Sequence, residues 1–155
     1  LNTKGEGKDF FYYLDKEVEC RCSPDQVQRY AAKLSGPLLD RIDIRMDVVR
    51  VPIVDLLLND TQEESSSMVL QRVVNARQIQ LERQGVLNSA LVSDKLHQFC
   101  SLKHLERQYL NASAETLKLS ARGYFRALRL ARTLADHDAQ LEISREHLAQ
   151  ALLWR

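Results

Sequence analysis

The sequence lacks the features that mark membrane and secreted proteins. In its 155 residues no window approaches about 18 uncharged apolar residues, and charges are spread through the first twenty positions. This pattern predicts neither a membrane span nor a signal peptide. Three cysteines are too few for a disulfide framework. We therefore expect a cytoplasmic chain whose thiols are reduced.

Sequence patterns of nucleophilic, metal and nucleotide chemistry are missing as well. The four histidines are scattered, neither His-Glu-x-x-His nor Gly-x-Ser-x-Gly occurs, and the five glycines form no Gly-x-x-x-x-Gly-Lys-Ser/Thr loop. Cys20 and Cys22 stand close together, but structural zinc takes four ligands and Cys100 is far along the chain. We predict no metal site and no P-loop, with metal on Cys20 and Cys22 left open.

Charge is balanced overall and uneven locally. There are 22 basic and 21 acidic residues, a net charge of +1, so the chain has no global field of the kind that coats nucleic acid. Any site for an anion must therefore be local. One segment, residues 118–132, carries five basic residues and no acidic one: Lys118, Arg122, Arg126, Arg129 and Arg132.

The composition, 45% hydrophobic and 28% charged, is that of a folded globular chain. Ser23 and Pro24 are a helix-start signal, and that helix should end near residues 35–37. Residues 42–48 alternate apolar and charged side chains, which predicts a strand that Pro52 ends. A lone strand needs hydrogen-bonding partners. Because this one has none in the sequence, and because the chain opens at Leu1, we expect a C-terminal fragment whose sheet lies upstream.

From residue 63 onward the pattern is helical. Residues 63–84 place an apolar stripe along one helix, Val69, Leu70, Val73, Val74, Ile79 and Leu81, with Gly85 as its stop. Ser93, Ser120 and Ser144 are N-cap candidates for helices over residues 94–100, 121–137 and 145–155, and a further helix should run from about 102 to 119. This stretch predicts a small helical bundle.

Two arginines have settings suited to phosphate. Arg41 follows a short helical turn just before the predicted strand, where a guanidinium could reach a neighbouring subunit; the alternative is a surface pair with Asp40 or Asp43. Arg122 lies in the first turn of the helix that Ser120 caps, where free N–H groups and the helix dipole favour an anion. The alternatives there are a solvated basic face and a recognition helix for DNA.

Two blocks of the sequence carry a resemblance to a known family. SGPLLDRID at residues 35–43 and LSARGYFRALRLARTLAD at residues 119–136 resemble the magnesium-chelatase-like AAA+ ATPases of the ComM/YifB type. The helix at 63–84 and the ending ISREHLAQALLWR fit the same family, so the resemblance covers about residues 20–155.

The resemblance implies a mainly α fold: a helical lid preceded by the end of an α/β core that keeps one strand. It divides the chain into an irregular segment at 1–22, the end of the core at 23–52 and the lid at 53–155. Family members form hexameric rings that bind ATP and Mg²⁺ between subunits, with a P-loop upstream of these blocks. Arg41 matches the arginine finger, which acts on the nucleotide of the adjacent subunit, and Arg122 matches the sensor-2 arginine.

Three functions remain open on these grounds. The first is the lid and arginine-finger part of a ring ATPase that remodels DNA, in branch migration or unwinding during recombination or competence. The second is the motor subunit of a magnesium chelatase, and the third is a free-standing helical adaptor or DNA-binding bundle. We expect the chain alone to be monomeric, to hold no cofactor and not to hydrolyse ATP, because it lacks the P-loop.

Overall fold

The computed structural model describes residues 22–33, 38, 41–46, 51 and 64–154. These residues fall into two units. One contains the first helix together with Leu38, Arg41, Ile42, Met46 and Val51. The other contains residues 43–45 and 64–154 and is mainly helical, as expected of a lid. Residues 1–21 of the irregular segment predicted at 1–22, and residues 34–37, 39–40, 47–50 and 52 of the core segment predicted at 23–52, lie outside the described residues.

Helix α1 (Pro24–Ala31) begins where the sequence predicts. The Ser23 hydroxyl accepts a hydrogen bond from the Gln26 N–H at 3.3 Å, and the Ser23 N–H donates to the Gln26 side chain at 2.9 Å. Pro24 occupies the first helical position, where its missing N–H costs nothing. This reciprocal capping box explains why a helix of eight residues starts sharply at Ser23.

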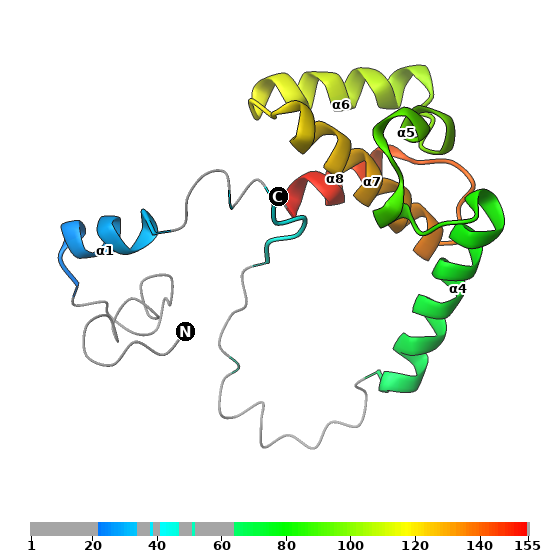
Figure 1. The fold of residues 1–155 in the computed structure, drawn as a ribbon, viewed down its shortest axis with the longest axis horizontal. Helices are drawn as coiled ribbons and strands as arrows, with labels where there is room; N and C mark the ends of the chain where they lie inside the picture. The colour runs from blue at the N-terminus through cyan, green and yellow to red at the C-terminus, as the bar shows by residue number, and fades with distance from the viewer. Residues whose placement is uncertain (1–21, 34–37, 39–40, 47–50, 52–63, 155) are drawn as a thin grey trace. The chain divides into compact units, whose positions relative to one another are not determined.

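The second unit contains five α-helices and one 3₁₀ turn among the residues that the structure describes. They are α4 (Ser66–Gln84), η2 (Asn88–Ala90), α5 (Ser93–Phe99), α6 (His104–Thr116), α7 (Ala121–His137) and α8 (Arg145–Leu153). Helix α7 is the central element: α4, η2, α5 and α8 all pack against it, and α6 packs against α8 (Figure 1). None of the described helices is long and apolar enough to cross a membrane.

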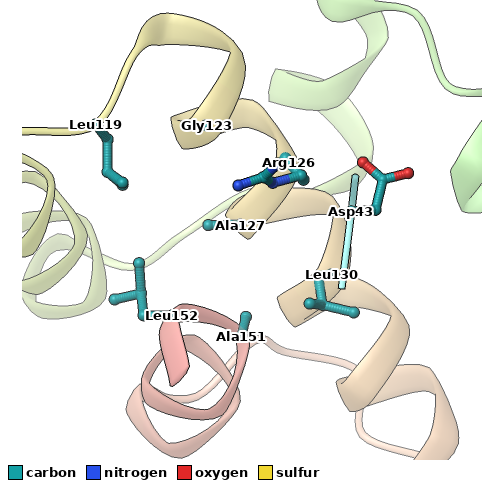
Figure 2. Close-up of a pocket in the computed structure, with 8 residues that line it drawn as sticks. All are labelled: Asp43, Leu119, Gly123, Arg126, Ala127, Leu130, Ala151 and Leu152. Carbon is teal, nitrogen blue, oxygen red and sulfur yellow. The ribbon is translucent and has the colours of Figure 1, made fainter. Parts of the chain in front are cut away.

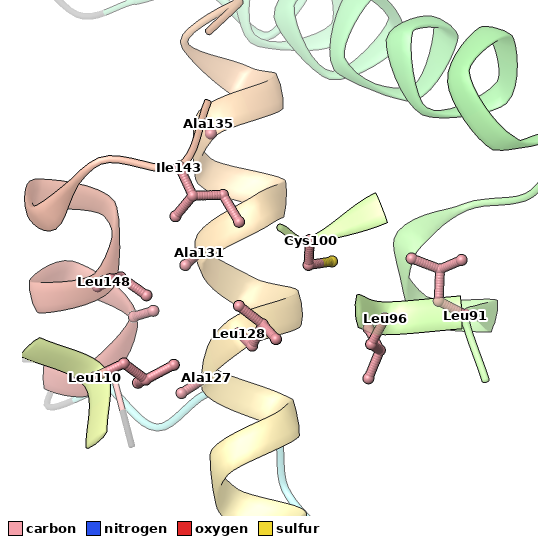
Figure 3. Packing of buried hydrophobic residues seen from close by; sticks show 11 residues of the cluster. Leu91, Leu96, Cys100, Leu110, Ala127, Leu128, Ala131, Ala135, Ile143 and Leu148 are labelled. Carbon is pink, nitrogen blue, oxygen red and sulfur yellow. The ribbon is translucent and has the colours of Figure 1, made fainter. Parts of the chain in front are cut away.

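Alanines let α7 and α8 approach each other closely. Ala127, Ala131 and Ala135 recur every four residues on α7 and are buried, facing Ile143 and Leu148 (Figure 3). Leu128 of α7 and Ala151 of α8 belong to the same cluster. The remaining members come from η2, α5 and α6 and their flanks: Leu91, Leu96, Cys100 and Leu110. The core is therefore one cluster of apolar side chains centred on α7.

Each of the turns that follow α6 and α7 contains a residue with left-handed backbone. Lys118 has φ 50° and Ala139 has φ 53°. The Leu119 N–H donates to the Ala114 carbonyl at 2.9 Å, and the Gln140 N–H donates to the Ala135 carbonyl at 2.7 Å. These are Schellman motifs, which usually have glycine at the left-handed position.

The predicted strand over residues 42–48 is not found in its described part. Residues 42–46 form neither helix nor strand, and residues 47–48 lie outside the described residues. The N–H of Arg45 donates instead to the carbonyl of Trp154, at the end of α8, at 2.8 Å. An alternating sequence becomes a strand only beside another strand, and the described part of this chain contains none.

The apolar stripe predicted on α4 does not face the core. Of its six residues, only Ile79 is partly covered, whereas Leu70 is 61% exposed. Ala76 and Gln80 are the buried positions, because only the second half of α4 packs against the bundle and the first half extends beyond it (Figure 1). Helical periodicity located the helix correctly and its contact face incorrectly.

Candidate functional site

The start of α7 is built by the short connection from α6. Left-handed Lys118 reverses the chain, and two residues later Ser120 caps α7. The Ser120 hydroxyl accepts a hydrogen bond from the Gly123 N–H at 3.0 Å. This cap was predicted from the sequence, and it fixes the direction in which the first turn of α7 points.

Arg122 lies in this first turn and is exposed. Within the described part of the chain, no hydrogen bond or ion pair holds its side chain. The 17-residue helix presents its positive dipole end at this turn, so a guanidinium and backbone N–H groups face solvent together. The arrangement suits an anion such as a phosphate group.

The other arginines of α7 are engaged inside the bundle. An Arg129 nitrogen donates to the Leu91 carbonyl at 3.0 Å, and Arg126 is only 7% exposed. Arg132 is 3% exposed and bonds both Asp136 and the loop that leads to α8. The expectation of a solvated basic face, and with it a groove-binding recognition helix, is therefore wrong for these three arginines. Arg129 and Arg132 therefore hold neighbouring segments to α7.

A buried polar network ties α4, η2 and α7 together. The Asp136 carboxylate is fully buried and is paired with Arg83 from α4 and Arg132 from its own helix. Asn88 donates to Asp136 at 2.8 Å and accepts from Arg83 at 2.9 Å. Burial lowers the pKa of Arg132, and the Asp136 carboxylate opposes that change. The network fixes the far end of α7 in the bundle.

Sequence reasoning did not identify this network as a unit. The spacing of Arg132 and Asp136, four residues apart on one helix, was a local signal for their pairing. Arg83 and Asn88 lie about fifty residues earlier in the sequence, and nothing local links them to Asp136. Only the packing of α4 and η2 on α7 brings the four side chains together.

A small pocket adjoins the start of α7, at its junction with α8 (Figure 2). Two residues of α7 line it: Gly123, which follows Arg122 directly, and Arg126, one helical turn further on. Asp43 lines it from a segment much earlier in the chain. The remaining lining residues are apolar: Leu119, Ala127, Leu130, Ala151 and Leu152.

Arg41 is exposed and lies in a turn of the first unit. Its N–H donates to the Leu38 carbonyl at 3.0 Å. Arg41 and Arg122 thus belong to different units of the chain. Among the described residues no three His, Cys, Asp or Glu side chains are grouped so as to hold a metal, and Cys20 lies outside that part.

The chain belongs to the magnesium chelatase subunit ChlI family of AAA+ proteins. The model of the C-terminal part of that family matches residues 63–155, which include every helix from α4 to α8. A second model, of the magnesium chelatase subunit ChlI itself, matches residues 11–56, which include Arg41.

Similar proteins come from several bacteria. The chain is 41% identical to YifB of Escherichia coli K12 over 135 residues, 87% of this chain and 27% of that protein. It is 38% identical to the competence protein ComM of Haemophilus influenzae, with 87% and 26% covered. A Mycobacterium tuberculosis protein is 35% identical over 149 residues, with 88% and 28% covered. The chain thus spans about a quarter of the length of these relatives.

Proposed function

We propose that this chain is the lid and arginine-finger part of a ring ATPase that couples ATP hydrolysis to the remodelling of DNA. The proposal rests on which arginines of α7 are exposed and which are engaged in the bundle. Three of them are turned into the bundle, while Arg122 alone remains exposed at the helix start. Membership of the magnesium chelatase ChlI family supports the same assignment.

The two arginines have different tasks in this proposal. Arg122 binds a phosphate of the nucleotide held by its own subunit, and Arg41 reaches the γ-phosphate held by the adjacent subunit. Both stabilise the charge that develops during phosphoryl transfer, and an arginine finger accelerates that step by about 10³- to 10⁵-fold. ATP and Mg²⁺ supply the reacting phosphate and its counter-ion, and the P-loop that holds them belongs to a core outside this chain.

The first test measures ATP turnover in the full-length protein that includes this chain and a P-loop. Arg122→Ala should lower kcat by roughly 10²-fold, the effect of removing one donor to a transition-state charge. Arg77→Ala is the matched control, because Arg77 is an exposed arginine on α4 and its loss changes the charge equally. Unchanged turnover in Arg122→Ala would rule out the sensor-2 role.

The client is proposed to be DNA, and the competence protein among the relatives favours it. The family model carries the name of magnesium chelatase, which favours a chelatase motor as the second candidate. The two differ in what stimulates ATP turnover. Branched or single-stranded DNA should raise turnover of a DNA motor, whereas a chelatase motor should depend on its partner chelatase subunits and ignore DNA.

A further inference from the structure

Residues 43–45 precede α4 by some twenty positions, yet they belong to the same unit as the lid helices. The N–H of Arg45 donates to the Trp154 carbonyl at the end of α8 at 2.8 Å. Asp43 lines the pocket whose other walls come from the α6–α7 turn, α7 and α8 (Figure 2). We call residues 43–45 in this position the lid seat.

The lid seat is close to the turn that carries Arg122. Gly123 follows Arg122 directly, and Arg126 is one helical turn further on; both line the pocket that contains Asp43. Ala151 and Leu152 close the pocket from α8. A displacement of α7 and α8 as a body therefore carries Asp43 and Arg45 with it.

The lid seat is also next to Arg41 along the chain. Arg41 is two residues before Asp43, and two residues of fully extended chain span at most about 7 Å. This limit follows from covalent geometry, so it holds for any arrangement of the two units. Whatever moves the lid seat must move the backbone of Arg41 unless the two peptide units between them absorb the change.

We propose that the lid seat positions Arg41, with Asp43 and Arg45 as positioning residues that contact no nucleotide. The proposal rests on the proposed function. In it, the packed helices of the lid set the position of the lid seat, and the lid seat sets the position of Arg41, which serves the neighbouring subunit. The lid thus sets the position of the trans-acting arginine through the short stretch of backbone that joins Arg41 to residues 43–45.

The test inserts two glycines between Ile42 and Asp43 in the full-length protein. The insertion leaves the lid seat and the turn of Arg41 intact but lengthens the link between them. We expect ATP turnover to fall at least tenfold with an unchanged melting temperature. The matched control inserts the same two glycines between Met46 and Asp47, beyond the lid seat, and should keep turnover within about twofold of the parent. Similar turnover in both insertion variants would overturn the proposal.

Mixed rings separate a positioning defect from general damage. The insertion variant should regain turnover when mixed with Arg122→Ala subunits, because these donate an intact Arg41 to its intact nucleotide site. Turnover should not recover when the insertion variant is mixed with Arg41→Ala subunits. In such rings neither kind of subunit donates a working Arg41 to its neighbour. Rescue by Arg41→Ala subunits, or none by Arg122→Ala subunits, would overturn the lid-seat proposal.

The same experiment tells the two proposals apart. Arg41→Ala and Arg122→Ala subunits must complement each other if one arginine acts in trans and the other in cis. Failure of that pair refutes the proposed function itself. If that pair complements while the insertion between Ile42 and Asp43 has no effect, the proposed function stands and the lid seat does not position Arg41.

Discussion

The arginines of helix α7 serve different purposes, and the extent to which each side chain is buried distinguishes them. Arg132 is 3% exposed and satisfies its charge with Asp136 and with two backbone carbonyls at 2.6 and 2.8 Å. Arg122, ten residues earlier, is exposed at the helix start. A buried guanidinium stabilises the fold only when its donors are paired, whereas an exposed one is available to a ligand.

At the residue scale, the first prediction concerns Asp136. Asp136→Asn removes the negative charge between the buried cations Arg83 and Arg132. We expect it to lower the free energy of unfolding by about 3 kcal/mol, because breaking a buried ion pair leaves charge uncompensated. Urea unfolding of the isolated chain measures this. Glu142→Gln is the control: its ion pair with Lys103 is exposed to solvent, so its loss should change stability far less than Asp136→Asn does. Equal losses would contradict the network's role.

The second residue-scale prediction concerns the Cys100 thiol. Burial raises its pKa from 9.0 to about 11, and nearby Arg132 only partly opposes this. Because the thiolate is the reactive form, iodoacetamide at pH 8 should modify Cys100 only as fast as the chain unfolds. Mass spectrometry of native and urea-unfolded chain compares the two rates. Rapid modification of the native chain would contradict the burial of this residue.

The raised pKa of Cys100 also predicts an alkaline effect on stability. The unfolded thiol loses its proton near pH 9, before the folded one does, so the folded state loses stability as the pH rises from 9 toward 11. Cys100→Ala should reduce this decline, relative to the parent chain measured at the same pH values. An identical decline in both would assign it to other groups.

At the element scale, side-chain caps decide where the helices begin. Ser23, Ser65, Ser120 and Ser144 each accept a hydrogen bond from a backbone N–H of the helix that follows. Gly85 ends α4 with φ 75°. These are local interactions between residues three or four apart, which is why three of the four serines and the glycine could be recognised from the sequence.

The element-scale prediction concerns the turn after α7. Ala139 has φ 53°, a left-handed conformation that glycine adopts without strain, so Ala139→Gly should stabilise the chain by about 1 kcal/mol. The matched control is Ala112→Gly, on the exposed side of α6, which should destabilise by about 1 kcal/mol. Thermal unfolding measures both. A loss of stability in Ala139→Gly would show that the turn is not strained.

At the scale of the whole molecule, the lid is assembled around α7 and needs little else. Its apolar cluster, its buried ion pairs and its caps all lie within residues 64–154. Outside that range, the described contribution to the same unit is the lid seat at residues 43–45.

This organisation predicts that residues 61–155 fold alone. The fragment should be helical by circular dichroism and unfold in one cooperative transition. Its free energy of unfolding should fall below that of the full chain by about 1 kcal/mol, the worth of one hydrogen bond, because the bond from Arg45 to Trp154 is lost. Gradual unfolding without a transition would mean that the lid depends on other segments.

The accuracy of the sequence predictions follows the range of the interactions involved. The starts of α1, α7 and α8 at their serine caps were predicted correctly, and the family resemblance was confirmed. Ser93, also predicted as a cap, is instead the first residue of α5, whose N-cap Val92 makes no side-chain hydrogen bond. Helix α1 ends at Ala31, before the end predicted near residues 35–37. The strand at 42–48 was predicted from alternation alone, and in its described part the N–H of Arg45 is bonded to α8. The face of α4 was wrong because the partner of a helix is not encoded in its own periodicity. The roles of Arg41 and Arg122 stay predictions.

The sequence by itself determined where α1, α7 and α8 begin and where α4 ends, that these residues contain no P-loop, and the family, because each depends on neighbouring residues or on short blocks. Only the tertiary structure decided that Arg126, Arg129 and Arg132 are engaged in the bundle while Arg122 is exposed. It also placed residues 43–45 on the lid. The physical reason is that burial and pairing depend on which distant segments pack together, and α7 meets α4, η2, α5 and α8 only in the folded chain.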